Sequence, residues 1–240
     1  MLAIKTKNLT KRYKEKIAVD GLNLEINQGE LFALLGTNGA GKTTTIKILS
    51  TLILPTEGEI KINGFDIVED RQKIKRLLNV SPQETAIAPN LSVKENLEFM
   101  AGVYEIPNKK KKINELIKLF KLDSVLNQKA KTLSGGWQRK LSIAISLINE
   151  PKILFLDEPT LGLDVIARKE LWKIIENLKG EVTIILTTHY MEEAESLSDR
   201  IGIMTEGNLI AVGTANELVE QTAAKCFEDA FVKIATGGEL

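Results

Sequence analysis

The fold is decided by one stretch of sequence, Leu31-Phe-Ala-Leu-Leu-Gly36-Thr-Asn-Gly-Ala-Gly41-Lys-Thr-Thr44. Five apolar residues with strand character lead directly into a segment with the spacing of a phosphate-binding loop: two glycines, a lysine and a hydroxyl. Glycine tolerates positive φ and has no Cβ, so successive backbone N–H groups can turn inward around a phosphate chain. Lys42 can then reach the β- and γ-phosphates, and the Thr43 hydroxyl is placed to ligate Mg²⁺.

A glycine-rich turn that merely joins a strand to a helix is the alternative interpretation of this stretch. The pattern should arise by chance in about 1% of chains of this length. Here it lies between a predicted strand and a predicted helix from Lys42 to about Leu49, whose positive N-terminal end points at the same anion. This context predicts a nucleoside triphosphate site.

Composition narrows the class of protein. The chain has 240 residues, 43% hydrophobic and 27% charged, which suits one large domain or one domain with an inserted lobe. Lys+Arg and Asp+Glu both total 32, so no net charge attracts nucleic acid, and no nucleic-acid partner is expected. A single cysteine, Cys226, excludes an internal disulfide and fits a reducing compartment. With no signal-peptide pattern and no long apolar run, we expect a soluble, cytoplasmic chain.

Alternating strands and helices predict an α/β fold around a parallel sheet. The run Ile153-Leu-Phe-Leu156 is continuously apolar, as in a strand buried on both faces of such a sheet. The predicted strands cover residues 2–8, 18–26, 31–35, 58–64, 77–83, 152–157, 181–188, 200–205 and 208–211.

Residues 85–132 change character and predict a helical lobe inserted into the α/β domain. Ser92 followed by Glu95 forms a capping box that opens a helix to about Tyr104. A second helix over residues 109–120 carries its apolar side chains on one face. These are Ile113, Leu116, Ile117 and Phe120.

The sequence Leu133-Ser-Gly-Gly136 precedes an apolar-rich stretch that reaches Ile148. A Ser-Gly-Gly turn at the start of a helix can be a second anion-binding terminus. It can equally be a flexible start to the helix, and the residues alone leave both interpretations open.

Polar side chains follow several of the predicted strands at the sheet edge where α/β proteins bind ligands. In phosphate-loop enzymes an acid at the end of such a strand holds Mg²⁺, and alternation along the strand sends its neighbour elsewhere. We therefore assign Asp157 to the metal and Glu158 to the attacking water. His189 is the only histidine; a lone histidine is more often structural, but this one ends a strand at the same edge. Gln83 is either a ligand contact or an ordinary loop amide.

Tyr13 lies between the first two predicted strands. A lone tyrosine is usually half-buried surface. Its flat ring could also stack on a nucleotide base.

Together these motifs resemble the nucleotide-binding subunit of ATP-binding cassette (ABC) transporters, and the resemblance covers essentially the whole chain. Leu133-Ser-Gly-Gly136 is the specific element, because a phosphate loop alone occurs in many ATPases and GTPases. The resemblance implies a P-loop NTPase fold of the ABC ATPase type, with N-terminal antiparallel β strands. It places a helical subdomain, about 85–150, within a RecA-like core over residues 1–225, followed by a short tail, 226–240.

The resemblance also implies ATP and Mg²⁺ as ligands. Tyr13 would stack on adenine, Thr43, Gln83 and Asp157 would arrange Mg²⁺, and Glu158 would polarise the water, with His189 contacting the γ-phosphate. The phosphates would be held by Gly36, Thr37, Asn38, Gly39, Ala40, Gly41, Lys42, Thr43 and Thr44.

A second cassette subunit is implied as a partner, in a homodimer or a heterodimer. Ser134, Gly135 and Gly136 would reach the γ-phosphate bound by that subunit, so that two cassettes sandwich two ATP molecules. Asp164 would help to join the halves.

A separate transmembrane permease is also implied, with the chain attached to it at the inner face of the membrane. The helical lobe and the segment after Gln83 look like its docking face. The sequences Thr188-His-Tyr-Met-Glu-Glu-Ala194 and Phe227-Glu-Asp-Ala-Phe231 resemble exporters of drugs, lipids or polysaccharides. The alternative is a soluble ABC ATPase that acts on ribosomes or DNA. Such relatives usually join two cassettes or carry basic extensions.

Three positions depart from the family pattern. Thr37 stands where proline is frequent, a change that the loop backbone should accept. Trp137 replaces the usual Gln or Met after the two glycines. Leu161 replaces a frequent serine, which puts a polar contact across the dimer in doubt.

Overall fold

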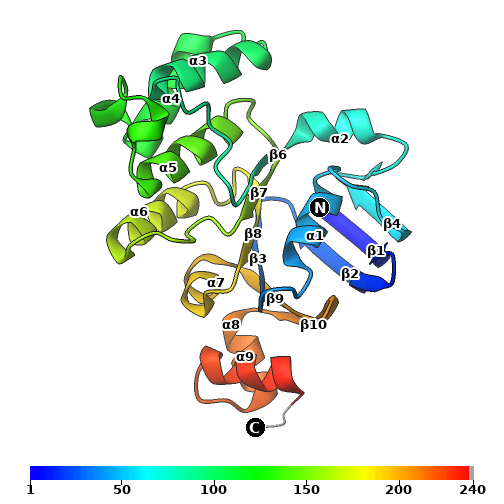
Figure 1. The fold of residues 1–240 in the computed structure, drawn as a ribbon. Coiled ribbons are helices and arrows are strands. Elements are labelled where there is room, and N and C mark those ends of the chain that lie inside the picture. The colour runs from blue at the N-terminus through cyan, green and yellow to red at the C-terminus, as the bar shows by residue number, and fades with distance from the viewer. Residues whose placement is uncertain (238–240) are drawn as a thin grey trace.

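The computed structural model describes residues 1–237. A six-stranded sheet in the order β10-β9-β3-β8-β7-β6 forms the centre of the molecule (Figure 1). All neighbours are parallel except β9 and β10, so the predicted α/β class is confirmed. Strands β3, β7 and β8 are buried throughout, which explains their continuous apolar runs. The strands are β3 (Leu31–Gly36), β6 (Leu78–Ser81), β7 (Ile153–Asp157), β8 (Thr183–Thr188), β9 (Arg200–Thr205) and β10 (Asn208–Gly213).

A second, antiparallel sheet has the order β2-β1-β4-β5. Its strands are β1 (Leu2–Tyr13), β2 (Lys16–Asn27), β4 (Glu57–Ile62) and β5 (Phe65–Asp66). The expected ends of the first two strands were wrong, because β1 continues five residues beyond Asn8. Asn8 takes a positive φ of 51°, and shifts in register beside it let the pairing resume as far as Tyr13 opposite Lys16.

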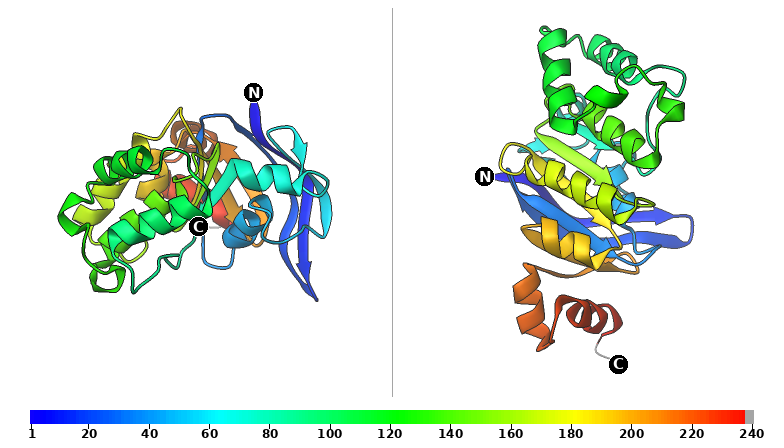
Figure 2. Two further views of the ribbon diagram at one scale, coloured as in Figure 1. Left: turned by 90° about the horizontal axis from the view of Figure 1, so that it is seen from above. Right: turned by 90° about the vertical axis from the view of Figure 1, so that its left-hand side faces the viewer.

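Helices surround the central sheet (Figures 1 and 2). Helices α3, α4 and α5 form the predicted lobe at the β6 end of the sheet, and Ser92 and Glu95 complete the predicted capping box of α3. The helices are α1 (Lys42–Leu49), α2 (Arg71–Leu77), α3 (Val93–Val103), α4 (Lys109–Phe120), α5 (Gly135–Ser146), α6 (Val165–Glu176), α7 (Met191–Leu197), α8 (Ala215–Thr222) and α9 (Phe227–Thr236).

The two faces of the central sheet contribute to two separate hydrophobic cores. Along β3, Phe32 and Leu34 join a core with α1 and the antiparallel sheet, whereas Leu31, Ala33 and Leu35 join a core with the helical lobe and α6. This alternation is the period of two expected of a strand covered on both sides. The C-terminal ends of β3, β6, β7 and β8 lie along one edge of the sheet. Because packed layers cover both faces of the sheet, the positions of these strand ends are fixed.

Most of the C-terminal segment expected as a tail, 226–240, is helical. Helix α9 buries Phe227 and Ala230 and packs against α8 and β9, while residues 238–240 lie outside the described part. Within residues 1–237, no helix combines the length and apolar character needed to span a bilayer.

Candidate functional site

The phosphate-binding loop joins the buried end of β3 to the start of α1. A Cβ on Gly36 would overlap the carbonyl oxygen of Met204, and one on Gly41, whose φ is 103°, would overlap that of Ala18. Only glycine fits at either position. Gly41 is also the N-cap of α1, and as a glycine it has no side chain that could accept a hydrogen bond from the first N–H groups of the helix. Because the first N–H groups of a helix have no acceptor within it, the amides at the start of α1 are available to an anion.

Lys42 is the buried cation of this loop. Its Nζ donates to the carbonyl oxygens of Gly36 at 2.7 Å and Thr37 at 3.2 Å, and it lies 3.6 Å from Oε1 of Glu158. Burial lowers the pKa of Lys42, and the charge of Glu158 opposes that change. Thr37 takes part only through its carbonyl here, so the departure from proline removes no side-chain contact that holds Lys42.

Asp157 is the last residue of β7 and is held by hydroxyl groups from two other elements. Thr187 of β8 donates to its Oδ1 at 2.6 Å, and Thr43 of α1 donates to the same atom at 3.3 Å. A hydroxyl and a carboxylate together at the end of the loop are oxygen ligands of the kind that Mg²⁺ prefers. These residues therefore fit the metal predicted for them.

Glu158 follows Asp157, but its backbone does not continue the strand conformation that was expected there. Alternation along the strand is the wrong reason for the separation of the two carboxylates, because Glu158 has a left-handed φ of 49° and begins a turn. The backbone N–H of Glu158 donates to the carbonyl oxygen of Thr187 at 3.2 Å and to the hydroxyl oxygen of the same threonine at 3.1 Å. Its Oε2 lies 2.7 Å from Nδ1 of His189.

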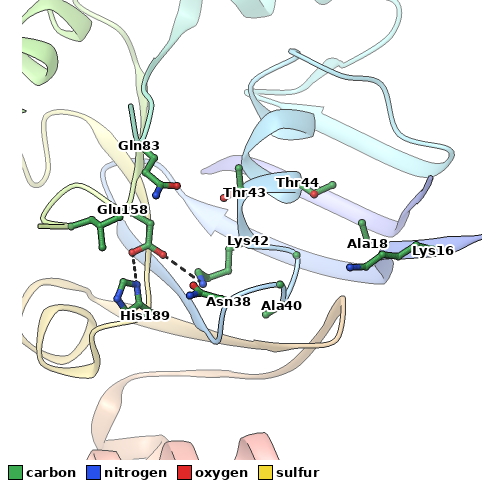
Figure 3. A pocket seen from close by; sticks show the side chains of 13 residues that line it. Lys16, Ala18, Asn38, Ala40, Lys42, Thr43, Thr44, Gln83, Glu158 and His189 are labelled. Carbon is green, nitrogen blue, oxygen red and sulfur yellow. Dashed lines mark hydrogen bonds and ion pairs between the residues drawn. The ribbon is translucent and has the colours of Figure 1, made fainter. Parts of the chain in front are cut away.

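Lys42, Glu158 and much of the phosphate loop line a cavity of about 370 Å³ (Figure 3). It contains predicted residues from four separate segments of the chain, and the side chains of Gln83, Glu158, His189 and Lys42 converge on one part of it. Its lining also contains three residues that sequence reasoning did not assign to the site, namely Lys16, Ala18 and Leu161. The predicted lining residues are Asn38, Gly39, Ala40, Gly41, Lys42, Thr43, Thr44, Gln83, Glu158 and His189.

Arg139 is a further residue that the sequence reasoning missed. From α5 it donates to the carbonyl oxygens of Pro82 at 2.6 Å and Gln83 at 2.5 Å, so it fixes the backbone of the segment that carries Gln83. Burial lowers the pKa of Arg139, although the charges of Asp157 and Glu193 oppose this effect. An arginine within the apolar-rich stretch after Gly136 was the only signal in the sequence, and it did not point to Gln83.

Several predicted site residues do not line this cavity. Gly36, Thr37 and Asp157 directly precede lining residues, whereas Tyr13, the Ser134–Gly136 segment and Asp164 belong to other parts of the chain. Tyr13 lies at the end of β1 and is 46% exposed, and Nζ of Lys11 is 5.2 Å from the centroid of its ring. Ser134 is the N-cap of α5 and its side chain makes no cap bond. Asp164 instead caps α6, where it accepts from the N–H groups of Ile166 and Ala167. Their predicted roles toward ATP and a partner subunit stay predictions.

Comparison with known proteins gives the same family as the motifs. A family model described as "ABC transporter" matches residues 19–161. The chain is 41% identical over 224 residues to the probable multidrug ABC transporter ATP-binding protein YbhF of Escherichia coli, covering 92% of this chain but only 38% of that protein. It is 40% identical to the daunorubicin resistance ATP-binding protein DrrA3 of Streptomyces coeruleorubidus, covering 92% of this chain and 71% of the relative.

Solved structures share the fold. A structure of an ATP-binding subunit of an ABC transporter superposes with a TM-score of 0.86 at 27% identity, covering 97% of this chain and 99% of the other. A dimeric structure of the cassette MJ0796 in a post-hydrolysis state, bound to ADP and phosphate, has a TM-score of 0.79 at 30% identity, covering 88% and 98%. The family match over more than half of the chain, together with these relatives, confirms the resemblance: the chain belongs to the ABC transporter family.

Proposed function

We propose that this chain binds ATP with Mg²⁺ and hydrolyses it to drive a transporter. The observation that carries the proposal is the convergence of Lys42, Glu158 and His189 beside the open amides of the phosphate loop. The loop amides and Lys42 bind the phosphate chain, which bears several negative charges. The buried position of Lys42 strengthens this attraction, since water screens it less.

Glu158 activates the attacking water in this proposal. The water oxygen forms a bond to the γ-phosphorus while its proton passes to the Glu158 carboxylate, and the bond from the γ-phosphorus to the β–γ bridging oxygen breaks to release ADP. His189 holds the carboxylate through Nδ1 and leaves its Nε2 for the γ-phosphate. When bound by Thr43, Gln83 and Asp157, Mg²⁺ neutralises phosphate charge.

A second cassette subunit completes the site in this proposal. Ser134 and Gly135 are exposed at the start of α5, outside the cavity of their own chain. Apolar side chains are also exposed at the start of α6, where Val165 is 58% and Ile166 is 74% exposed. The starts of α5 and α6 are adjacent, because a Cβ on Gly136 would lie 3.2 Å from that of Ala167. Water-exposed apolar groups beside an incomplete phosphate site support a dimer that buries both.

We assign the contact with the permease to the helical lobe. Phe99 and Val103 of α3 are each 58% exposed, and the adjacent Tyr104 is 38% exposed. Such a cluster suits a protein partner, and we assign it to a separate transmembrane subunit at the inner face of the membrane. The names of the relatives YbhF and DrrA3, which refer to multidrug transport and daunorubicin resistance, support export of a drug-like compound.

The alternative, a soluble cassette ATPase that acts on ribosomes or DNA, has less support. The chain carries no net charge, and the named relatives are ATP-binding proteins of transport or drug resistance. An adjacent reading frame that encodes a polytopic membrane protein would favour the transporter. Co-purification of the chain with ribosomes would favour the alternative.

The dimer and the reaction are tested together on the purified chain. Light scattering should give a monomer mass without nucleotide and a dimer mass with ATP and Mg²⁺, and phosphate should be released. A mass that ATP does not change, in a preparation that hydrolyses ATP, would contradict the sandwich. Absence of turnover both alone and with the permease would contradict the reaction.

A further inference from the structure

Glu193 is a buried acid that the proposed reaction does not use. It lies in the first turn of α7, and its side chain is fully buried. Trp172 of α6 donates its indole N–H to Oε1 at 3.0 Å. Desolvation raises the pKa of Glu193, and the negative charge of Glu158 adds to that change. An acid in such a position is costly unless its oxygens find donors, so its remaining contacts matter.

Two threonines face this carboxyl from the two segments that carry the site. Thr188 directly precedes His189, and Thr160 lies two residues after Glu158; their hydroxyls act to lower the pKa of Glu193. The Thr188 oxygen accepts from the N–H of Tyr190 at 2.9 Å, and that bond does not use the hydroxyl proton, which can be donated to the carboxyl.

The contact with Thr160 is open in this structure. Its Oγ1 and Oε2 of Glu193 are both buried, and neither has a hydrogen-bond partner within residues 1–237. One group can donate and the other can accept, so each is the partner that the other lacks. Hydrogen bonds around active sites are often long without substrate and shorten when it binds.

We propose that Glu193 is a positioning residue of the ATPase site. Held by Trp172, its carboxyl ties the segment after Glu158 to the end of β8, and the bond to Thr160 closes when nucleotide binds. This inference rests on the roles proposed above for Glu158 and His189.

The link fixes the distance between the groups that it serves. Glu158 and His189 are in contact at 2.7 Å but belong to segments after different strands. Once the bond to Thr160 has closed, this buried bridge prevents those segments from separating. Since a misplacement of about 1 Å can reduce turnover about 10²-fold, the carboxyl controls the rate without touching ATP.

The deciding variant is Thr160→Val, which removes the hydroxyl and keeps the volume. The measurements are kcat per bound nucleotide, the dissociation constant for ATP, and Tm. Trp172→Phe, which removes the indole N–H together with part of the ring, provides a second arm, and Glu193→Ala a third. Glu195→Ala is the matched control, because Glu195 is exposed on the same helix.

The proposal predicts that Thr160→Val lowers kcat at least about fivefold at unchanged ATP affinity and Tm, and that Trp172→Phe lowers kcat in the same direction. Adding Thr160→Val to Glu193→Ala should then cause no further loss, because the two side chains act through one link. A merely structural role predicts an equal or higher Tm for Thr160→Val, since an unpaired buried hydroxyl is lost, and a normal kcat.

A normal kcat for Thr160→Val, or additive losses in the double variant, would overturn the proposal. Failure of the proposed function would give different results: the unaltered chain would show no ATP turnover, or Glu158→Gln would retain turnover.

Discussion

Nδ1 of His189 lies 2.7 Å from Oε2 of Glu158, across the ends of two neighbouring parallel strands. The other carboxylate oxygen faces Lys42 at 3.6 Å. Glu158 is therefore held from both sides: by a side chain that the phosphate loop supplies and by one that follows β8. A carboxylate held in this way points into the cavity beside the phosphate loop (Figure 3), where a water attacking the γ-phosphate would lie.

Lys42→Ala is expected to abolish ATP binding or turnover almost completely. The substitution removes the buried ammonium that the phosphates attract most strongly, and it leaves Glu158 without its nearest cation. Binding of labelled ATP and phosphate release measure the effect. Lys47→Ala is the control, because Lys47 is exposed on the same helix. Hydrolysis at the normal rate by a clean Lys42→Ala preparation would show that the loop is not the ATP site.

Lys16→Gln should weaken ATP binding modestly. Lys16 is exposed at the start of β2 and lines the cavity (Figure 3), and within residues 1–237 no carboxylate pairs with it. An exposed ionic contact contributes at most about 1 kcal/mol, so the KM for ATP should rise about two- to fivefold, and less at high salt. Lys14→Gln, in the same hairpin but outside the cavity, should change nothing. Equal KM values for the two variants would remove Lys16 from the site.

The stability of the chain should depend on pH through Glu193. Its pKa is raised in the folded state, so folding favours the protonated form. The contribution of this group is therefore fully present below its ordinary pKa of 4.5 and is lost as the pH rises through the raised value. Relative to Glu193→Gln, which cannot titrate, the unaltered chain should lose stability as the pH rises above 4.5. Urea unfolding of both proteins across this range checks it, and a constant difference between them would contradict the assignment.

Most of the fold could be predicted because its main signals are local. Residues 42–49 form the predicted helix, and the buried strands β7 and β8 show as apolar runs. Helix α2, in contrast, has one buried residue, Ile74, so its sequence carries little apolar periodicity. The sequence therefore did not predict α2. It also did not predict helix α7, which spans only seven residues.

The site was predictable only where its residues stand at strand ends or in the phosphate loop. Lys16 enters the cavity because the β1–β2 hairpin folds over the loop, and no spacing in the sequence encodes that contact. Arg139 likewise reaches the Gln83 segment across 56 residues of chain. Glu193 looks like any acid in the first turn of a helix until the packing of α6 and α7 buries it.

The central claim is that Glu158 performs the chemistry while Asp157 serves the metal, and one side-by-side measurement tests it most directly. Glu158→Gln and Asp157→Asn are each incubated with ATP and Mg²⁺, and size-exclusion mass, bound nucleotide and phosphate release are determined. Glu158→Gln should lose about 10²-fold or more in turnover and accumulate as an ATP-bound dimer, because binding persists without the base. Asp157→Asn should instead weaken the dependence on Mg²⁺ and trap no dimer. Normal hydrolysis by Glu158→Gln, or a trapped dimer from Asp157→Asn alone, would contradict the claim.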